Sequence, residues 1–253
     1  MIKRLLIPLT LSALVGACSS SDERGALNTQ ASSANQAKNA ASSHASKAQL
    51  QTLVEQYTKQ FLHHEPLLST AIGVPESLAG EGYNTRFPDF SPMGMRALQD
   101  DMNSAALAVA KVNSQGFSQD EKRHQQIVAD ILRYYAGFSE FHGGYIDTWA
   151  GHLPYIINQL SGPLIDVPKV MQVQQPVSSV AQAEEYIARL AHFDFLVAGV
   201  IEKYKADKLN GVQLPKKLYP KTIAYFENFL ASPVAEHALV TSFMHKLAQT
   251  DVS

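Results

Sequence analysis

The sequence has little cysteine: Cys18 is the single one among 253 residues. One cysteine cannot form a disulfide within the chain, and no second thiolate is available as a metal ligand or a nucleophile. A metal site would therefore have to use histidine, aspartate or glutamate. The net charge is −2 and no cluster of basic residues stands out, which argues against a nucleic-acid-binding protein.

Long hydrophobic runs are also missing. The uncharged stretch Leu5–Ala17 follows Lys3 and Arg4, and it is shorter than the roughly 20 apolar residues that span a bilayer. A basic start, a short apolar run and a small-residue exit are typical of a bacterial export signal. We predict that residues 1–17 form a signal peptide and are removed.

Cys18 lies directly after the small residues Gly16 and Ala17, and the run Leu14–Ser19 resembles a lipobox. At such a sequence a bacterial prolipoprotein is acylated on the cysteine and cut before it. We therefore expect Cys18 to be the lipidated N-terminus, whose acyl chains bind the membrane. Ser19, in place of an aspartate, favours the outer membrane with the protein facing the periplasm. The alternative is a free or buried thiol.

The segment after the signal peptide, residues 18–45, contains mainly Ser, Ala, Asn, Gln and Lys, with Leu27 as its only large apolar residue. Such a segment buries too little apolar surface to fold by itself, so we predict a flexible tether. Residues 46–253 then form the folded part, and their number suits one domain.

Apolar residues in this domain recur mostly at spacings of three and four, which predicts a mostly α, irregular multi-helix fold without convincing strands. Ser91-Pro92 and the capping-box pattern Ser118–Glu121 mark two helix starts. Helices are expected at about 50–64, 92–109, 119–142, 180–210, 215–230 and 233–249, with an irregular segment at 66–91 and a loop-rich one at 145–177.

The apolar faces of two of these helices can be assigned from the spacing. The predicted apolar face consists of Ile127, Ile131, Tyr134, Phe138 and Phe141 in the third helix. In the fourth helix it consists of Ala183, Ile187, Leu190, Val197, Ile201 and Tyr204. Arg189 lies four residues after Glu185, a spacing typical of a stabilising surface ion pair on a helix.

Three segments together resemble a known family. They are Leu153-Pro154-Tyr155-Ile156-Ile157-Asn158-Gln159-Leu160-Ser161-Gly162-Pro163, then Ala183-Glu184-Glu185-Tyr186-Ile187-Ala188-Arg189-Leu190, and Phe61-Leu62-His63-His64-Glu65-Pro66 with Ala71-Ile72-Gly73 after it. The pattern, spread over about residues 50–247, is similar to that of bacterial secreted proteins and lipoproteins of domain of unknown function 885. Members of that family are typically much longer and similar to helical zinc metallopeptidases.

The resemblance implies a His-Glu-x-x-His helix in the C-terminal half of a full-length member, where two histidines bind zinc and the glutamate activates water. This sequence has no such motif. The nearest string, His64-Glu65-Pro66, lacks the second histidine and contains a helix-breaking proline. The chain therefore resembles the N-terminal half of such a protein. We expect no catalytic residue, metal site or cofactor in this chain. Zinc would be bound by a full-length protein. Whether the chain is an enzyme stays open.

Candidate binding residues lie in the loop-rich segment. An aromatic and amide-rich loop is typical of the lining of a cleft for extended polar ligands, and structural packing is the alternative. The candidate substrate-binding residues are Trp149, Tyr155, Asn158 and Gln159. His142, His152 and Asp147 offer three ligands of a zinc site, but their spacing matches no ligand motif, which favours surface or capping roles.

Two hypotheses follow. In the first, the chain is the non-catalytic N-terminal part of an envelope lipoprotein similar to zinc metallopeptidases, and it forms one wall of a peptide cleft completed by a C-terminal half. In the second, it is a free-standing helical lipoprotein that binds a peptide or an envelope partner. A half-domain exposes apolar surface meant for its partner, whereas a finished module unfolds cooperatively as a soluble species.

Overall fold

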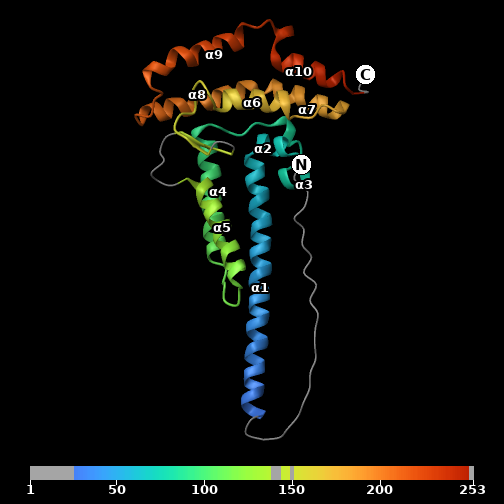
Figure 1. Cartoon of the computed structure of the whole chain (residues 1–253), viewed down its shortest axis with the longest axis vertical. Coiled ribbons are helices and arrows are strands. Elements are labelled where there is room, and N and C mark those ends of the chain that lie inside the picture. Colours follow the sequence, from blue (N-terminus) through green and yellow to red (C-terminus); the bar gives the residue numbers. More distant parts are fainter. Residues whose placement is uncertain (1–25, 138–143, 149–150, 251–253) are drawn as a thin grey trace. The chain divides into compact units, whose positions relative to one another are not determined.

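The computed structural model describes residues 26–137, 144–148 and 151–250. The chain divides into two compact units, Met1–Ser42 and Ser43–Ser253. The described part of the first unit is the beginning of α1 (Ala26–His64), and all other elements belong to the second. The predicted signal peptide and Cys18 lie outside the described residues. As predicted, the fold is mostly α (Figure 1).

The start of α1 differs from the expected tether over 18–45, because the chain is already helical from Ala26. Ser43 and Ser46 are buried, and the Ser43 hydroxyl donates a hydrogen bond to the carbonyl of Gly116 at 3.2 Å. The segment is rich in alanine, the residue with the highest helix propensity. Extending an existing helix also needs no new nucleus, so polar residues before 46 join it readily.

A first group of helices in the second unit consists of the end of α1, α4 (Pro92–Ala110) and α5 (Gln119–Ala136). Both predicted starts are confirmed. The Ser91 hydroxyl accepts a hydrogen bond from the amide of Gly94 at 3.1 Å, and Ser118 and Glu121 form a reciprocal capping box. The core of this group is apolar and consists of Leu50, Met102, Ala105, Ala106, Val109, Val112, Phe117, Ala129 and Leu132.

The segment expected to be irregular at 66–91 contains three short elements: α2 (Pro66–Ile72), α3 (Glu76–Ala79) and the 3-10 helix η1 (Tyr83–Thr85). α1 ends at His64, as predicted, because Pro66 cannot continue its hydrogen bonding and begins a new helix. α2 ends at Gly73, whose left-handed backbone (φ 66°) lets its amide bond back to Ser69 and Thr70.

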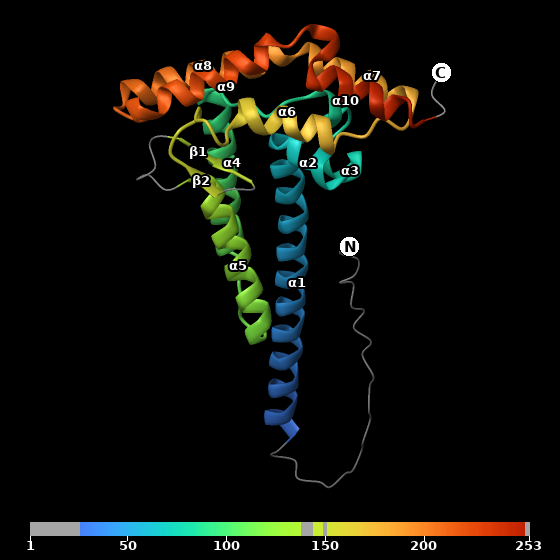
Figure 2. The same ribbon diagram turned by 45° about the horizontal axis from the view of Figure 1, so that its top comes forward.

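The second group of helices crosses the ends of α1 and α4 (Figures 1 and 2). It contains α6 (Pro163–Val173), α7 (Val180–Ala191), α8 (Phe193–Leu209), α9 (Tyr219–Ala231) and α10 (Ala238–Leu247), with 3-10 turns η2 (Lys216–Leu218) and η3 (Val234–Glu236). The helix expected over 180–210 is broken at His192. The loop expected at 145–177 contains α6. The buried core includes Val167, Met171, Tyr186, Leu196, Val200 and Leu239.

A short antiparallel hairpin, which the periodicity did not predict, precedes α6. β1 (Tyr145–Asp147) pairs with β2 (Gly151–Leu153), and Tyr145 lies opposite Leu153. Strands of three residues are too short to show an alternating pattern in the sequence. Within the described ranges, no helix is long and apolar enough to cross a membrane.

The predicted buried face of α5 is wrong. Ile127 and Ile131 are about half exposed (48% and 52%), whereas Gln125 is buried. Phe138 and Phe141 lie outside the described residues. The Gln125 amide donates hydrogen bonds to the carbonyls of Val109 (2.8 Å) and Val112 (2.9 Å). It thereby satisfies carbonyl groups at the end of α4 that have no partner within that helix. A polar residue therefore faces the core, and the isoleucines face outward.

The face of α7 and α8 was assigned correctly only in part. Ala183 is buried, and Leu190 and Tyr204 pack against the core as expected. Ile187 and Ile201 are exposed, while Arg189 is fully buried. Arg189 does not form the expected surface pair. Its guanidinium donates to the Gln175 side chain at 3.0 Å and to the carbonyl of Tyr83 at 2.7 Å. These bonds connect α7 to η1 and to the end of α6, which explains why an arginine lies in the core.

Candidate functional site

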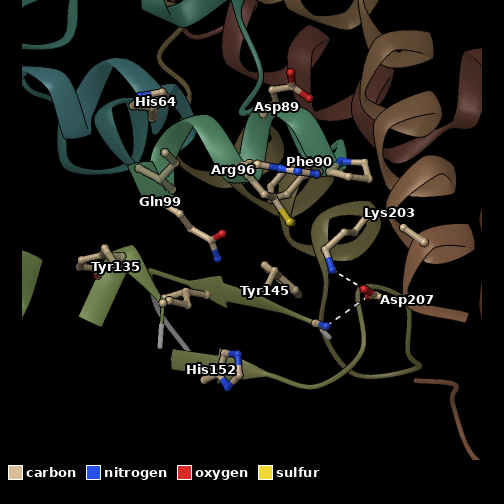
Figure 3. Close-up of a pocket in the computed structure, with 18 of the residues that line it drawn as sticks. His64, Asp89, Phe90, Arg96, Gln99, Tyr135, Tyr145, His152, Lys203 and Asp207 are labelled. Atoms are coloured by element: carbon tan, nitrogen blue, oxygen red, sulfur yellow. Dashed lines mark hydrogen bonds and ion pairs between the residues drawn. The ribbon is translucent and has the colours of Figure 1, made fainter. Parts of the chain in front are cut away.

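A cavity of about 430 Å³ lies where the end of α1, the first turns of α4, the β1–β2 hairpin and the last turns of α8 meet (Figure 3). Its lining combines aromatic rings with titratable and amide side chains. The polar and aromatic lining residues are His64, Glu65, Asp89, Phe90, Arg96, Gln99, Tyr135, Tyr145, His152, Lys203, Asp207 and Asn210. A cavity of this size can hold a small molecule or part of a peptide.

The floor of the cavity contains a buried ion pair between Lys203 and Asp207, one turn apart on α8. The Lys203 side chain is 10% exposed and that of Asp207 is 4% exposed. The second carboxylate oxygen of Asp207 accepts a hydrogen bond from the amide of Gly144 at 3.2 Å (Figure 3). Asp207 thus balances a buried positive charge and attaches the start of the hairpin to α8.

Glu65 lies in the cavity wall between α1 and α2. Burial raises the pKa of its carboxyl to about 8, and the nearby charge of Asp147 contributes in the same direction. At neutral pH this carboxyl is therefore largely protonated and can donate a hydrogen bond. A partly buried carboxyl of this kind is typical of functional sites, although structural sites also contain them.

The raised pKa of Glu65 predicts that the protein loses stability as the pH rises from about 5 to 8. The folded state holds the proton up to about pH 8, whereas the unfolded state releases it near the ordinary value of 4.5. The unfolded state therefore binds fewer protons in this window, and the free energy of unfolding falls with pH. The glutamine in Glu65→Gln has no proton to lose in this pH range, so the variant should lack this part of the pH dependence. The expected change in the free energy of unfolding is about 2 kcal/mol between pH 5 and 8, after allowance for partial exposure.

Urea unfolding of the wild type and Glu65→Gln at several pH values measures the effect. The difference between the two proteins isolates Glu65 from histidines that titrate in the same range. His63, for example, has a pKa lowered mainly by burial and contributes with the opposite sign. A difference that does not change with pH would show that Glu65 titrates normally.

Two histidines complete the polar part of the wall. Burial lowers the pKa of His152, as does the charge of Lys203, so that its imidazole is kept neutral at neutral pH. His64 bonds to the Asp101 carboxylate at 2.8 Å, which holds its ring at the mouth of the cavity. The site thus offers neutral donors and acceptors together with the cation Arg96.

The three residues considered as zinc ligands are not brought together in the part of the chain that can be described. Asp147 and His152 lie on opposite strands, where Asp147 pairs with Gly151 and His152 with Ile146. His142 lies outside the described residues. Among those residues, no group of three or more His, Cys, Asp or Glu side chains is placed to hold a metal ion.

The predicted binding residues Tyr155, Asn158 and Gln159 lie in the loop between β2 and α6 and do not line the large cavity, while Trp149 lies outside the described residues. The side-chain oxygen Oδ1 of Asn158 accepts hydrogen bonds from the backbone amides of Leu160 (2.8 Å) and Ser161 (3.0 Å), so it stabilises the turn. The Gln159 side-chain oxygen is buried and has no hydrogen-bond partner among the described residues. A binding role of these residues stays a prediction.

Sequence reasoning missed Glu65, Tyr145, Lys203 and Asp207 as parts of one site. The spacing of Lys203 and Asp207 by four residues was a usable signal for a pair on one helix. Their proximity to Glu65 and Tyr145 had no local signal, because it depends on how α8 packs beside the hairpin.

Comparison with solved structures shows that the chain is similar to part of a longer protein. It superposes with a TM-score of 0.78 on a crystal structure described as "the putative lipoprotein from Colwellia psychrerythraea", at 33% sequence identity. The match covers 81% of this chain and 35% of the other, so the chain spans about a third of that protein. No curated protein matches the sequence.

A family model supports the resemblance seen in the sequence. The model for "Bacterial protein of unknown function (DUF885)" matches residues 66–252, which is more than half of the chain. The predicted family is thereby confirmed, and the match includes the segments that begin at Leu153 and Ala183, while Phe61–Glu65 precede its first residue. This chain belongs to the DUF885 family of bacterial proteins.

Proposed function

We propose that the protein is an envelope lipoprotein, anchored through lipid on Cys18 and facing the periplasm from the outer membrane. Its helical domain is the non-catalytic N-terminal part of a protein similar to zinc metallopeptidases, and it forms one wall of a peptide cleft. Two findings support an envelope lipoprotein: the family membership and the likeness to a chain described as a lipoprotein. The lipobox-like run Leu14–Ser19 agrees with them.

The observation that carries the binding role is the cavity beside α4. Its aromatic rings, Phe90, Tyr135 and Tyr145, provide apolar contact, while Gln99 and His152 provide donors and acceptors. A peptide presents the matching groups: amide donors, carbonyl acceptors and side chains of mixed polarity. The lining is more polar than that of a typical small-molecule pocket, which favours a ligand that makes many hydrogen bonds.

Exposed apolar side chains support the view that this domain is one part of a larger fold. They lie on α5 and on α7 to α10, and some are almost fully exposed, such as Leu209 (89%) and Val234 (80%). The group consists of Ile127, Ile131, Ile187, Phe195, Ile201, Leu209, Ile223, Leu230, Val234 and Met244. Where such side chains form a contiguous patch, they mark a surface that another domain or chain covers. The matched Colwellia protein has about two thirds of its length outside the match, which is room for such a part.

The peptide-binding role predicts that purified chain binds labelled peptides, and that Gln99→Ala weakens this binding about 2- to 10-fold, the effect of one lost hydrogen bond. Fluorescence anisotropy with a pool of random peptides measures it. Gln51→Ala is a matched control, because Gln51 is an exposed glutamine of α1 whose amide bonds only to Glu55 among the described residues. The proposal would be contradicted if Gln99→Ala and Gln51→Ala weakened peptide binding to the same extent, or if the wild type bound no peptide up to millimolar concentration.

A further inference from the structure

A second, smaller cavity adjoins the large one. Its volume is about 30 Å³, and it shares Glu65, Phe90, Tyr145 and Ile146 with the larger cavity. It lies where the start of α2, strand β1 and the first turn of α6 meet, and Asp147 and Asp166 line its other side. The four shared residues therefore line both cavities, and the small one has additional acidic residues in its lining.

Three carboxyl groups face this small cavity: Glu65, Asp147 and Asp166. Burial raises the pKa of Asp166, and the charge of Asp147 raises it further, just as Asp147 raises that of Glu65. The amide of Gly162 donates to one Asp166 oxygen at 2.7 Å. A positive charge that acts on this group is that of Lys169, an exposed residue one turn further along α6. The described lining of the cavity thus contains three acidic side chains, of which Asp147 also interacts elsewhere and Glu65 becomes charged only near pH 8.

Tyr145 gives an independent indication that something polar occupies this space. Its side chain is 6% exposed, and its hydroxyl is buried without a hydrogen-bond partner among the described residues. The hydroxyl oxygen would lie 3.9 Å from a Cβ atom at Gly162, so it points toward the start of α6, where Asp166 lies. An unpaired buried hydroxyl is costly, and such groups in native proteins usually have a partner. The missing partner is expected to be part of a ligand.

We propose that the small cavity is a subsite for a primary ammonium group, either the α-amine or a lysine side chain of a peptide bound in the large cavity. The inference rests on the proposed peptide-binding function. An ammonium group donates three hydrogen bonds, and its acceptors here are the Asp166 carboxyl, the Tyr145 hydroxyl and Glu65 once the Glu65 carboxyl has lost its proton. The Phe90 and Tyr145 rings also line the cavity, with their centroids 6.0 Å apart in an edge-to-face arrangement.

The arrangement of donors distinguishes the cations. An ammonium group is a compact point charge with three rotatable donors, whereas a guanidinium is a rigid planar fork. Three acceptors around one small cavity of about 30 Å³ suit the ammonium group, so the subsite should prefer lysine-like or α-amino groups to arginine-like ones. A bound metal ion is a poorer match, since the described carboxylates and histidines include no group of three placed to hold one.

The first test uses small probes and needs no peptide. Purified chain is titrated with butylammonium, butylguanidinium and neutral N-butylacetamide at pH 8.5, where Glu65 is largely ionised, and binding is followed by calorimetry. We expect butylammonium to bind at least about tenfold more tightly than either analogue, because a hydrogen-bonded charge is involved. Equal binding of butylammonium and butylguanidinium, or no binding of butylammonium, would overturn the subsite.

Matched variants then locate the binding. Glu65→Gln and Tyr145→Phe should each weaken butylammonium binding about tenfold or more, the second because it removes an acceptor aimed into the cavity. Glu202→Gln, which removes the same charge from an exposed position of α8, should leave it unchanged. Because Tyr145→Phe removes an unpaired buried hydroxyl, its melting temperature should equal or exceed that of the wild type, so weaker binding would not reflect unfolding.

Peptides distinguish the two sources of the amine and separate this inference from the proposed function. The set contains one peptide with a free α-amine, its N-acetylated form, and the acetylated form with an added lysine. If only the peptide with a free α-amine binds tightly, the subsite binds an α-amine. If the acetylated peptide with the added lysine also binds tightly, the subsite accepts a lysine side chain. If all three bind equally, the subsite is wrong and peptide binding stands. If butylammonium binds but no peptide does, the peptide-binding function is wrong and the subsite stands.

Discussion

Replacing Asp207 by alanine is expected to lower the free energy of unfolding by about 3–5 kcal/mol, the usual cost of breaking a buried ion pair by removing one partner. The Lys203 ammonium would be left in a buried position without its counter-charge. The amide of Gly144 would lose its acceptor as well, and the start of the hairpin would be detached from α8. Urea unfolding at pH 7 measures the change.

Two further variants show that the effect belongs to the pair. Glu202→Ala, on the exposed side of α8, should change stability by less than about 0.5 kcal/mol. The double variant Lys203→Met, Asp207→Leu removes both charges and should be clearly more stable than Asp207→Ala, since hydrophobic replacements of buried pairs are often tolerated. A loss below about 1 kcal/mol for Asp207→Ala would show that water reaches Lys203 and screens its charge.

Replacing Cys18 by serine is expected to move the protein from the membrane fraction to the soluble periplasmic fraction. A serine has no thiol to acylate, and without acyl chains the domain loses its predicted anchor. Cell fractionation with an antibody to the folded domain measures the change, and incorporation of a labelled fatty acid into the wild type but not the variant identifies the lipid. Ser20→Ala, two residues further on, is the control and should leave the protein in the membrane. Membrane association of the serine variant equal to that of the wild type would refute lipidation at this residue.

Local features of the fold were predicted well. The starts of α4 and α5 were correct because Ser91 and Ser118 form their capping hydrogen bonds within three residues along the chain. The end of α1 was correct because the effect of Pro66 on the helix is equally local. Family membership was recognised for a related reason, since it depends on short runs of residues that can be compared directly.

Besides the hairpin, α6 and the break at His192, the main errors concern which side of a helix is buried. On α5 the isoleucines were expected inside, yet Gln125 occupies the core because it finds the carbonyls of Val109 and Val112 there. On α7 Arg189 is buried because Tyr83 and Gln175 accept its hydrogen bonds. A hydrophobic pattern ranks residues only by their free energy of transfer from water. It cannot account for hydrogen-bond partners that elements distant in the sequence supply to a buried polar side chain.

The sequence by itself determined the mostly α fold, the helix boundaries set by caps and prolines, the family, and the prediction of lipidation at Cys18. Only the tertiary structure decided where a site lies, because Glu65, Tyr145 and Asp207 come from three separate elements. Caps and breaks depend on atoms a few residues apart, whereas a cavity and its charges depend on the packing of elements remote in the chain. For that reason the candidate residues Tyr155, Asn158 and Gln159 were sought in a loop, while the polar cavity lies between α4, α8 and the hairpin.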